Sequence, residues 1–331
     1  MLFAGSSAES DATLRAMKAV ATAAGAHPLT ETDRIALIAA HTVVFGGHDT
    51  LDPAALPDIT GAELAAAVTD GNREHAAAFL AVMATVDGTV DGPRIQTAID
   101  YADAMALDEP FLRDLGELAA RKLAEVRADI ARRNERSFTG HDPDESIDAW
   151  IGVYREHPDP ALHARFETLA DAAAGTFGRA FADFYTANGF AYPGVAAAPN
   201  QEFAVPHDSA HVISGYDTSV QGELLVSTFT AGMHADDAVT AHVLPVIISW
   251  HLGVPLADFA GSATGALDPR KFWVAWSRGD QLVGDTLAPE FDFWAHVDQP
   301  LDEVRKVMGV PPLDPDDAAD GAYPDWYHPS A

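Results

Sequence analysis

The amino-acid sequence predicts an all-α fold, and three observations support this prediction. Apolar residues recur at helical spacing, for example at Ala76, Phe79, Leu80 and Met83. Residues that favour helix starts precede several such segments, which are rich in alanine. No segment shows the convincing alternation of apolar and polar residues that is typical of a half-buried strand. Helices are therefore expected along the whole chain.

The first 140 residues are expected to form a separate helical domain. Thr30 is a candidate helix cap, and Thr60 with Glu63 fits a capping box. A run of turn-forming residues, 137–144, interrupts the helical pattern and predicts a domain boundary. The helices expected before it lie over about 10–24, from Thr30 onward, from 60, after Asn72, over 93–105 and over 110–134.

Residues 141–312 are expected to form the second helical domain, followed by a loose acidic tail over 313–331 that is rich in proline and aspartate. A loop is expected at 191–206. The helices expected in this part lie over about 160–187, 208–214, 222–246, 270–280 and 301–308. Gly175 and Gly178 are the candidate positions for a bend in the first of them.

The composition excludes several classes of partner and site. The chain has 20 basic and 50 acidic residues and a net charge of −30, so a nucleic-acid partner is not expected. Cysteine is absent, which excludes disulfides, thiolate metal ligands and cysteine nucleophiles. Neither an apolar run of membrane-spanning length nor a secretory signal is visible. The sequence therefore predicts a cytoplasmic protein without a transmembrane segment, at most peripheral to a membrane.

One short segment carries a chemical signature. His207 and His211 are four residues apart, so on a helix both imidazoles lie on one face. Asp208 follows the first histidine and can act as a metal ligand or orient one. Glu223 opens the next expected helix and adds a carboxylate. Two nitrogens and carboxylate oxygens suit zinc, iron or manganese, so the sequence predicts one divalent transition metal here.

This pattern, H-D-x-x-H followed by eleven residues and E, resembles the signature of the coenzyme Q (ubiquinone) biosynthesis protein four family. The likeness includes Gly222 and the residues 215–218, Gly-Tyr-Asp-Thr. A weaker likeness covers 272–279 and 300–310, so the resemblance extends over about 145–312.

The resemblance implies an all-helical fold in which His207, Asp208, His211 and Glu223 hold a metal that is usually described as zinc. It also implies an apolar groove for a polyprenyl chain, which we expect to be lined from 222–256. The implied role is in the maturation of the quinone head group, by oxidative decarboxylation or by presentation of the lipid to other biosynthetic enzymes.

Three further residues are candidates for contact with a substrate. Tyr216 and Asp217 adjoin the metal motif, and Arg278 could pair with an anionic head group. The alternatives are loop structure for the first two and an ordinary ion pair for the arginine. Core packing is the preferred interpretation of His242 and His251, which flank an apolar run, and a surface or pocket position is preferred for His234.

Residues 25–135 faintly resemble TerB-like helical domains of tellurite resistance proteins, through the segment 29–37, Leu-Thr-Glu-Thr-Asp-Arg-Ile-Ala-Leu. The first 140 residues hold 12 of the 20 basic residues, so this part is less acidic than the rest. We expect it to provide no metal ligand and to serve as an interaction or oligomerisation unit, with a homo-oligomer as one outcome.

Three functions remain open from the sequence. The first is a metal-dependent lyase or oxidative decarboxylase on a prenylated or aromatic head group, with Asp208 and Glu223 as catalytic residues. The second is a scaffold that binds a hydrophobic lipid and holds a structural metal. The third, a metal-dependent phosphohydrolase, fits the motif least well. An open coordination position would distinguish the first from the second.

Overall fold

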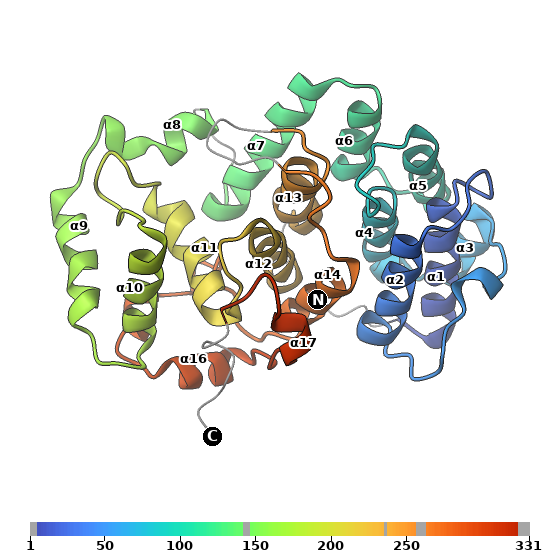
Figure 1. Cartoon of the computed structure of the whole chain (residues 1–331). Coiled ribbons are helices and arrows are strands. Elements are labelled where there is room, and N and C mark those ends of the chain that lie inside the picture. The colour runs from blue at the N-terminus through green and yellow to red at the C-terminus, as the bar shows by residue number, and fades with distance from the viewer. Residues whose placement is uncertain (1–4, 142–145, 235–236, 256–262, 324–331) are drawn as a thin grey trace. The chain divides into compact units, whose positions relative to one another are not determined.

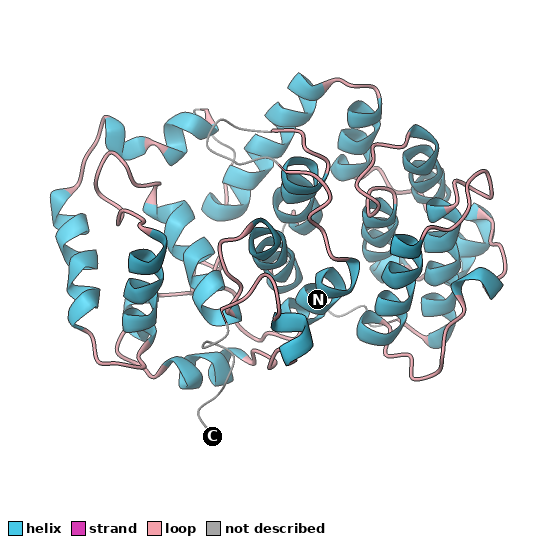
Figure 2. Cartoon of the chain, viewed as in Figure 1, coloured by secondary structure: helices cyan, strands magenta, loops and turns pink. Residues whose placement is uncertain are grey.

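The computed structural model describes residues 5–141, 146–234, 237–255 and 263–323. In these ranges the chain consists of helices and connecting loops without a strand, which confirms the all-α class (Figures 1 and 2). None of the helices in the described ranges is long and apolar enough to cross a membrane.

The chain divides into two compact units. Unit 1 comprises residues 131–242 and 278–331, and unit 2 comprises residues 2–130 and 243–277. These units do not coincide with the predicted domains, because residues 243–277 group with the first 130 residues. The independent folding of the predicted domains 1–140 and 141–312 remains a prediction.

Unit 2 contains the alanine-rich helices. Residues Ala76 to Met83 of α4 are all buried, so this helix is apolar on every side and lies in the core of the unit. The ring of Phe79 meets Trp273 and Trp276 edge to face, at centroid distances of 5.1 and 5.8 Å. The α-helices wholly within this unit are α1 Ser7–Ala21, α2 Glu31–Ala39, α3 Gly61–Ala67, α4 Arg73–Met83, α5 Gly92–Ala104, α6 Pro110–Ala119 and α13 Leu244–Val246.

Unit 1 is built around an aromatic core. Phe166, Phe177, Phe181 and Phe293 are buried and pack with aliphatic side chains from the neighbouring helices. The α-helices wholly within this unit are α8 Ile147–Ile151, α9 Pro160–Glu167, α10 Phe177–Asn188, α11 Gln201–Ser214, α12 Val220–Met233, α15 Phe293–His296, α16 Leu301–Met308 and α17 Pro315–Ala318. Two helices span the division, namely α7 Leu123–Thr139 and α14 Pro269–Asp280.

The predicted helix caps agree closely with the structure. Thr30 accepts a hydrogen bond from the backbone of Asp33, and Thr60 accepts one from Glu63. Both acidic side chains in turn accept from the backbone of the capping residue, so both are complete capping boxes. Asn72 precedes α4 as predicted, but its side chain makes no capping bond to that helix.

Several predicted helices are shorter than expected. The expected helix 110–134 is two helices, because Arg121 adopts a left-handed conformation with φ of 61°. The expected helix 160–187 breaks before α10, where Gly175 has a φ of 81°. The expected helix 222–246 ends at Met233, and residues 238–251 contain π-helical turns around Pro245.

Two other helices extend into segments that were predicted to be a linker or a loop. Helix α7 continues to Thr139, into the predicted linker 137–144, of which 142–145 lie outside the described residues. The predicted loop 191–206 contains the start of α11, because Asn200 caps the backbone N–H of Glu202 and Pro206 is tolerated inside the helix. The other interactions of this helix offset the cost of about 3 kcal/mol that an interior proline carries.

The predicted loose tail 313–331 needs a correction over its first part. The backbone N–H of Asp217 donates to Gly321, and that of Tyr323 donates to Gly215, at 3.0 Å each. These bonds attach residues 321–323 to the turn between α11 and α12, so this part of the tail is ordered by backbone pairing. Residues 324–331 lie outside the described residues.

Candidate metal centre

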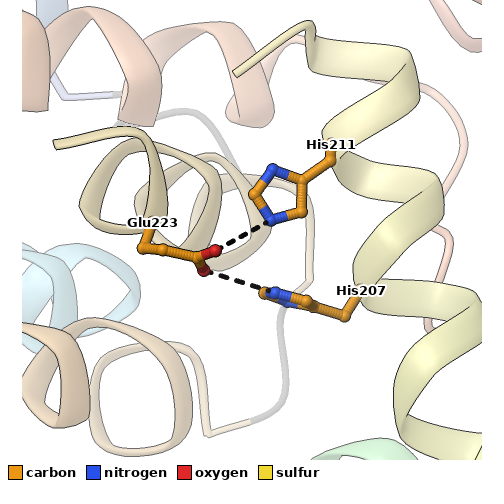
Figure 3. A group of neighbouring side chains, drawn as sticks. All are labelled: His207, His211 and Glu223. Carbon is orange, nitrogen blue, oxygen red and sulfur yellow. Dashed lines mark ion pairs between the residues drawn. The ribbon is translucent and has the colours of Figure 1, made fainter. Parts of the chain in front are cut away.

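Two adjacent helices of unit 1 present the residues of the predicted metal site. His207 and His211 lie one turn apart on α11, and Glu223 lies in the first turn of α12 (Figure 3). Gly215 ends α11 in the left-handed conformation, and Ser219 caps α12 by accepting from the backbone of Gly222. The sharp turn between the helices therefore brings the carboxylate back to the two imidazoles.

The three side chains converge closely enough to share one ion. One ligand atom from each lies within 4.8 Å of the other two. His207 Nε2 is 3.5 Å from Glu223 Oε2, and His211 Nε2 is 3.6 Å from Glu223 Oε1. These separations exceed a normal N–H···O hydrogen bond. They agree with the separation of about 3.4 Å between two ligand atoms in a tetrahedral site with bonds of roughly 2.1 Å.

The surroundings of His211 fix its tautomer for metal binding. Its Nδ1 lies 2.9 Å from the backbone oxygen of Tyr216, which accepts the Nδ1 proton, so Nε2, which faces Glu223, is the nitrogen that could bind a metal once it loses its own proton. The ring stacks on Phe184, at a centroid distance of 5.2 Å. His207 stacks on Phe203 at the same distance. Both imidazoles are thereby held in orientation, and the donor set fits a divalent transition metal.

The three side chains differ in their exposure to solvent. His211 is 1 % exposed at its side chain, whereas His207 and Glu223 are 18 % and 22 % exposed. Burial alone would raise the pKa of Glu223, but the two imidazoles outweigh it and lower that pKa. Burial alone would lower the pKa of His211, and the Glu223 carboxylate reverses this shift. The two groups stabilise each other as an ion pair in the metal-free protein.

Asp208, the fourth predicted ligand, does not belong to this group of three. Its Oδ2 accepts a hydrogen bond of 2.6 Å from the hydroxyl of Tyr185 on α10. Burial raises the pKa of Asp208 above its ordinary value, although the neighbouring histidines and Tyr185 act in the opposite direction. Burial and the Asp208 charge also raise the pKa of Tyr185 well above 10, so that hydroxyl keeps its proton. Sequence reasoning missed Tyr185 because nothing near it in the chain identifies its partner.

The three predicted substrate-binding residues all make structural contacts. Tyr216 is 1 % exposed, and the Arg278 guanidinium lies 5.2 Å from its ring centre. Arg278 donates to the backbone oxygens of Ser214 and Pro311. Asp217 accepts from the backbone N–H and hydroxyl of Ser219 at the start of α12. A direct role of these residues in substrate binding remains a prediction.

The other histidines singled out in the sequence are largely buried. Nε2 of His242 lies 2.7 Å from the hydroxyl of Ser137, and burial lowers the pKa of this histidine well below 6.5. His251 bridges the backbone of Val86 and Leu267 within unit 2. His234 lines a cavity, as described below. Among the described residues, the group of side chains that could hold a metal therefore includes no histidine outside α11.

The expected lining of an apolar groove, residues 222–256, is not the lining of the cavity found in unit 1. In the stretch 222–256, Leu224, Val226 and Phe229 are core residues of unit 1, and Leu244 and Ile247 are core residues of unit 2. A cavity of about 800 Å³ does exist in unit 1. From the expected stretch, however, only His234 and Asp237 line it. The five apolar side chains named above are buried in the cores of their own units and do not line this cavity.

No family model matches the chain, and no curated protein matches it. One solved structure is similar, a chain from Nostoc punctiforme PCC 73102 described as a candidate ubiquinone biosynthesis protein. The match has 19 % sequence identity and a TM-score of 0.30, and it covers 73 % of this chain and 99 % of that chain.

Proposed function

We propose that this protein binds one divalent transition metal through His207, His211 and Glu223 and acts as an enzyme of quinone biosynthesis. The observation that carries the proposal is the convergence of these three ligand atoms within 4.8 Å at the turn between α11 and α12. The resemblance of the H-D-x-x-H…E motif supports the choice of pathway. The proposed reaction is that of a lyase or oxidative decarboxylase on an aromatic or prenylated head group.

The number of protein ligands favours catalysis over a structural metal. Catalytic zinc sites characteristically combine three protein ligands with an open position, whereas structural sites use four. Asp208 is engaged by Tyr185 and stands outside the group of three. A bound metal would supply Lewis acidity to a carboxylate or phenolate oxygen of the substrate.

The protein groups around the site can hold and move protons. Tyr185 keeps its hydroxyl proton and donates a hydrogen bond to Asp208, the residue that follows His207 in the chain. This hydrogen bond holds the Asp208 carboxylate in place. Glu223 has two oxygens and lies against both imidazoles, so one oxygen can serve as ligand and the other as proton acceptor. We propose Asp208 and Glu223 as the catalytic carboxylates.

Metal analysis of the purified full chain tests the site. Protein prepared without chelator should contain about one zinc, iron or manganese per chain, and the double variant His207→Ala, His211→Ala should lose it. His157, an exposed histidine of the same unit, provides the matched control variant His157→Ala. A wild-type protein that takes up no divalent metal would disprove the proposed centre.

Cobalt substitution tests the open position. The absorption spectrum of the cobalt protein should change when an aromatic carboxylate such as 4-hydroxybenzoate is added, because the ligand enters the first coordination sphere. The variant Asp208→Asn should retain the metal. A cobalt spectrum that no carboxylate or phenol changes would contradict catalysis at the metal and favour the scaffold with a structural ion.

A further inference from the structure

A short segment near the end of the described chain lies against the turn between the two helices of the metal group. We call residues 321–323 the strap and residues 215–218 the turn. Tyr216 of the turn and Ala322 of the strap form an antiparallel bridge, which is flanked by the two backbone hydrogen bonds of 3.0 Å described above. The strap follows α17 in the chain, so this contact joins elements that are distant in sequence. The strap is therefore in a position to hold the turn.

One peptide group connects the strap to a proposed metal ligand. The peptide between Tyr216 and Asp217 donates its N–H to the backbone oxygen of Gly321 at 3.0 Å. Its carbonyl oxygen accepts the Nδ1 proton of His211 at 2.9 Å. A peptide group is planar and trans, so its N–H and its C=O are fixed in opposite directions. The hydrogen bond from this N–H to the strap therefore also fixes the direction in which the carbonyl holds the His211 imidazole.

The strap also touches the start of α12, the helix that carries Glu223. Gly321 has a φ of 122°, a conformation that glycine adopts readily and other residues rarely adopt. A Cβ atom at this position would lie 3.0 Å from Gln221 Cγ and 3.1 Å from Leu225 Cδ1. The lack of a side chain thus allows the strap backbone to lie directly on α12. A larger residue at position 321 would push the strap away from this helix.

The side chain of Tyr323 makes a third connection between the strap and the turn. The side-chain amide of Asn188, at the end of α10, donates to the Tyr323 hydroxyl at 3.0 Å. The hydroxyl of Thr218 in the turn donates to the other atom of the same amide, Asn188 Oδ1, at 2.6 Å. The Tyr323 ring also lies edge-on to Phe184, the ring on which His211 stacks. Asn188 therefore joins the strap and the turn through one side chain.

From these contacts we propose that the strap is a positioning element for the metal centre. It fixes the peptide that orients His211 and the helix start that carries Glu223, and it thereby keeps both ligands at the separation that admits an ion. The inference rests on the proposed function, because it concerns the same metal group. Interactions that orient metal ligands typically change the affinity for the metal by about 10- to 100-fold.

Competition with a chelator for zinc, measured on the full chain, tests the proposal. We expect Gly321→Val to bind zinc about 10-fold more weakly than the wild type. The visible absorption of the cobalt-loaded variant should also shift, because the geometry of the ligands changes.

Gly175→Val is the matched control for backbone strain. Gly175 belongs to unit 1, has a φ of 81°, and is exposed, and a Cβ atom there would meet no atom of the described residues within 4 Å. A valine in this left-handed conformation should lower the melting temperature. The zinc affinity and the cobalt spectrum of this control should equal those of the wild type.

Tyr323→Phe is a milder variant that introduces no backbone strain. It removes only the hydroxyl that meets Asn188 and retains the ring, so it should fold like the wild type. We expect it to bind zinc about 3-fold more weakly, as for the loss of one hydrogen bond. Amide hydrogen exchange gives the reciprocal measurement, because a strap that favours metal binding must be favoured by the metal to the same extent. Zinc should therefore slow exchange at the backbone N–H groups of Asp217 and Tyr323 in the wild type.

The outcomes separate the strap from the metal centre itself. Wild-type zinc affinity in both strap variants would overturn the role of the strap and leave the proposed centre intact. A loss of affinity in Gly321→Val that Gly175→Val reproduces, or exchange at the strap that zinc does not slow, would do the same. A wild-type chain that binds neither zinc nor cobalt would instead disprove the centre, and the role of the strap with it.

Discussion

Two buried clusters of charged groups, one in each unit, illustrate the difference between a closed ion pair and a site for an ion. In unit 2, the Arg94 guanidinium lies 2.6 Å from Asp33 Oδ2 and 2.7 Å from Asp87 Oδ2. It also donates to the backbone oxygen of Ala21. In unit 1, the imidazoles lie 3.5 and 3.6 Å from the oxygens of Glu223.

The distances and the chemistry of the cation explain this difference. A guanidinium is always charged and has no lone pair to offer, so its best arrangement is direct contact with carboxylates. An imidazole can be neutral and can donate a lone pair, so a longer separation from a carboxylate leaves space for a metal ion. The first cluster therefore stabilises the fold, and the second is suited to binding.

The largest expected effect comes from truncation. It tests whether residues 243–277 need the helices of their own unit to fold, or whether the predicted domains fold independently. A chain of residues 142–331 retains 243–277 but loses their unit-mates, including Phe79 beside Trp273. Exposure of these aromatic residues should abolish cooperative unfolding or cause aggregation. Circular dichroism and light scattering measure this. A truncated chain that unfolds cooperatively and keeps the metal would support the predicted boundary near residue 140 instead.

The next effect concerns the cluster of Arg94, Asp33 and Asp87 in unit 2. Arg94→Met leaves Asp33 buried without its cation and should lower the free energy of unfolding by about 3–5 kcal/mol. Metal content should not change, because Arg94 belongs to unit 2. Arg113→Met, at a side chain that is 66 % exposed, serves as the control and should cost well under 1 kcal/mol. Chemical denaturation gives both values, and a loss below 1 kcal/mol for Arg94→Met would remove the contrast.

In the cluster of His207, His211 and Glu223, a substitution should affect metal binding more than stability. Glu223→Gln should weaken metal binding by about 100-fold or more, because it removes a charged ligand. At a pH above the raised pKa of His211, the same substitution should change the stability of the metal-free protein little, since that imidazole is then neutral and no longer pairs with the carboxylate. Competition with a chelator measures the affinity, and thermal unfolding measures the stability.

The pH dependence sharpens this prediction. The raised pKa of His211 means that the His211–Glu223 pair stabilises the metal-free fold below about pH 6.5, and that this contribution disappears as the pH rises through the raised value. The lowered pKa of Glu223 means that the contribution is present above about pH 4.3 and disappears at lower pH. Metal affinity should instead increase with pH, because the ligands must be deprotonated. Parallel pH trends for both quantities would argue against a metal at these histidines.

The smallest expected effect compares one helix cap from each unit. Thr30→Ala and Ser219→Ala should each cost about 1 kcal/mol of stability. Only Ser219→Ala should also weaken metal binding, by a few-fold, because Ser219 holds the start of α12 where Glu223 lies. Equal effects of both variants on the metal would show that the cap does not position the carboxylate.

Local signals in the sequence predicted much of the fold. The all-α class, the caps at Thr30 and Thr60, and the helix at 301–308 depend on nearby residues, and the structure shows each of them. The interruption of the helix 160–187 at Gly175 was one of two predicted positions for a bend, because glycine adopts the left-handed conformation without strain. The break at Arg121 was missed because a left-handed residue of another type is decided by the packing of the flanking helices.

The amino-acid sequence by itself determined the helical class and predicted a metal set of His207, Asp208, His211 and Glu223. The structure brings the two histidines and Glu223 together, because a spacing of four along a helix and a carboxylate after a short turn are local features. Only the tertiary structure decided that Asp208 pairs with Tyr185, that residues 243–277 group with the first 130, and that His234 joins Asp285 beside a cavity. These contacts join residues that are 23 or more positions apart. Their formation depends on which helices pack together, and no short segment of the chain specifies that packing.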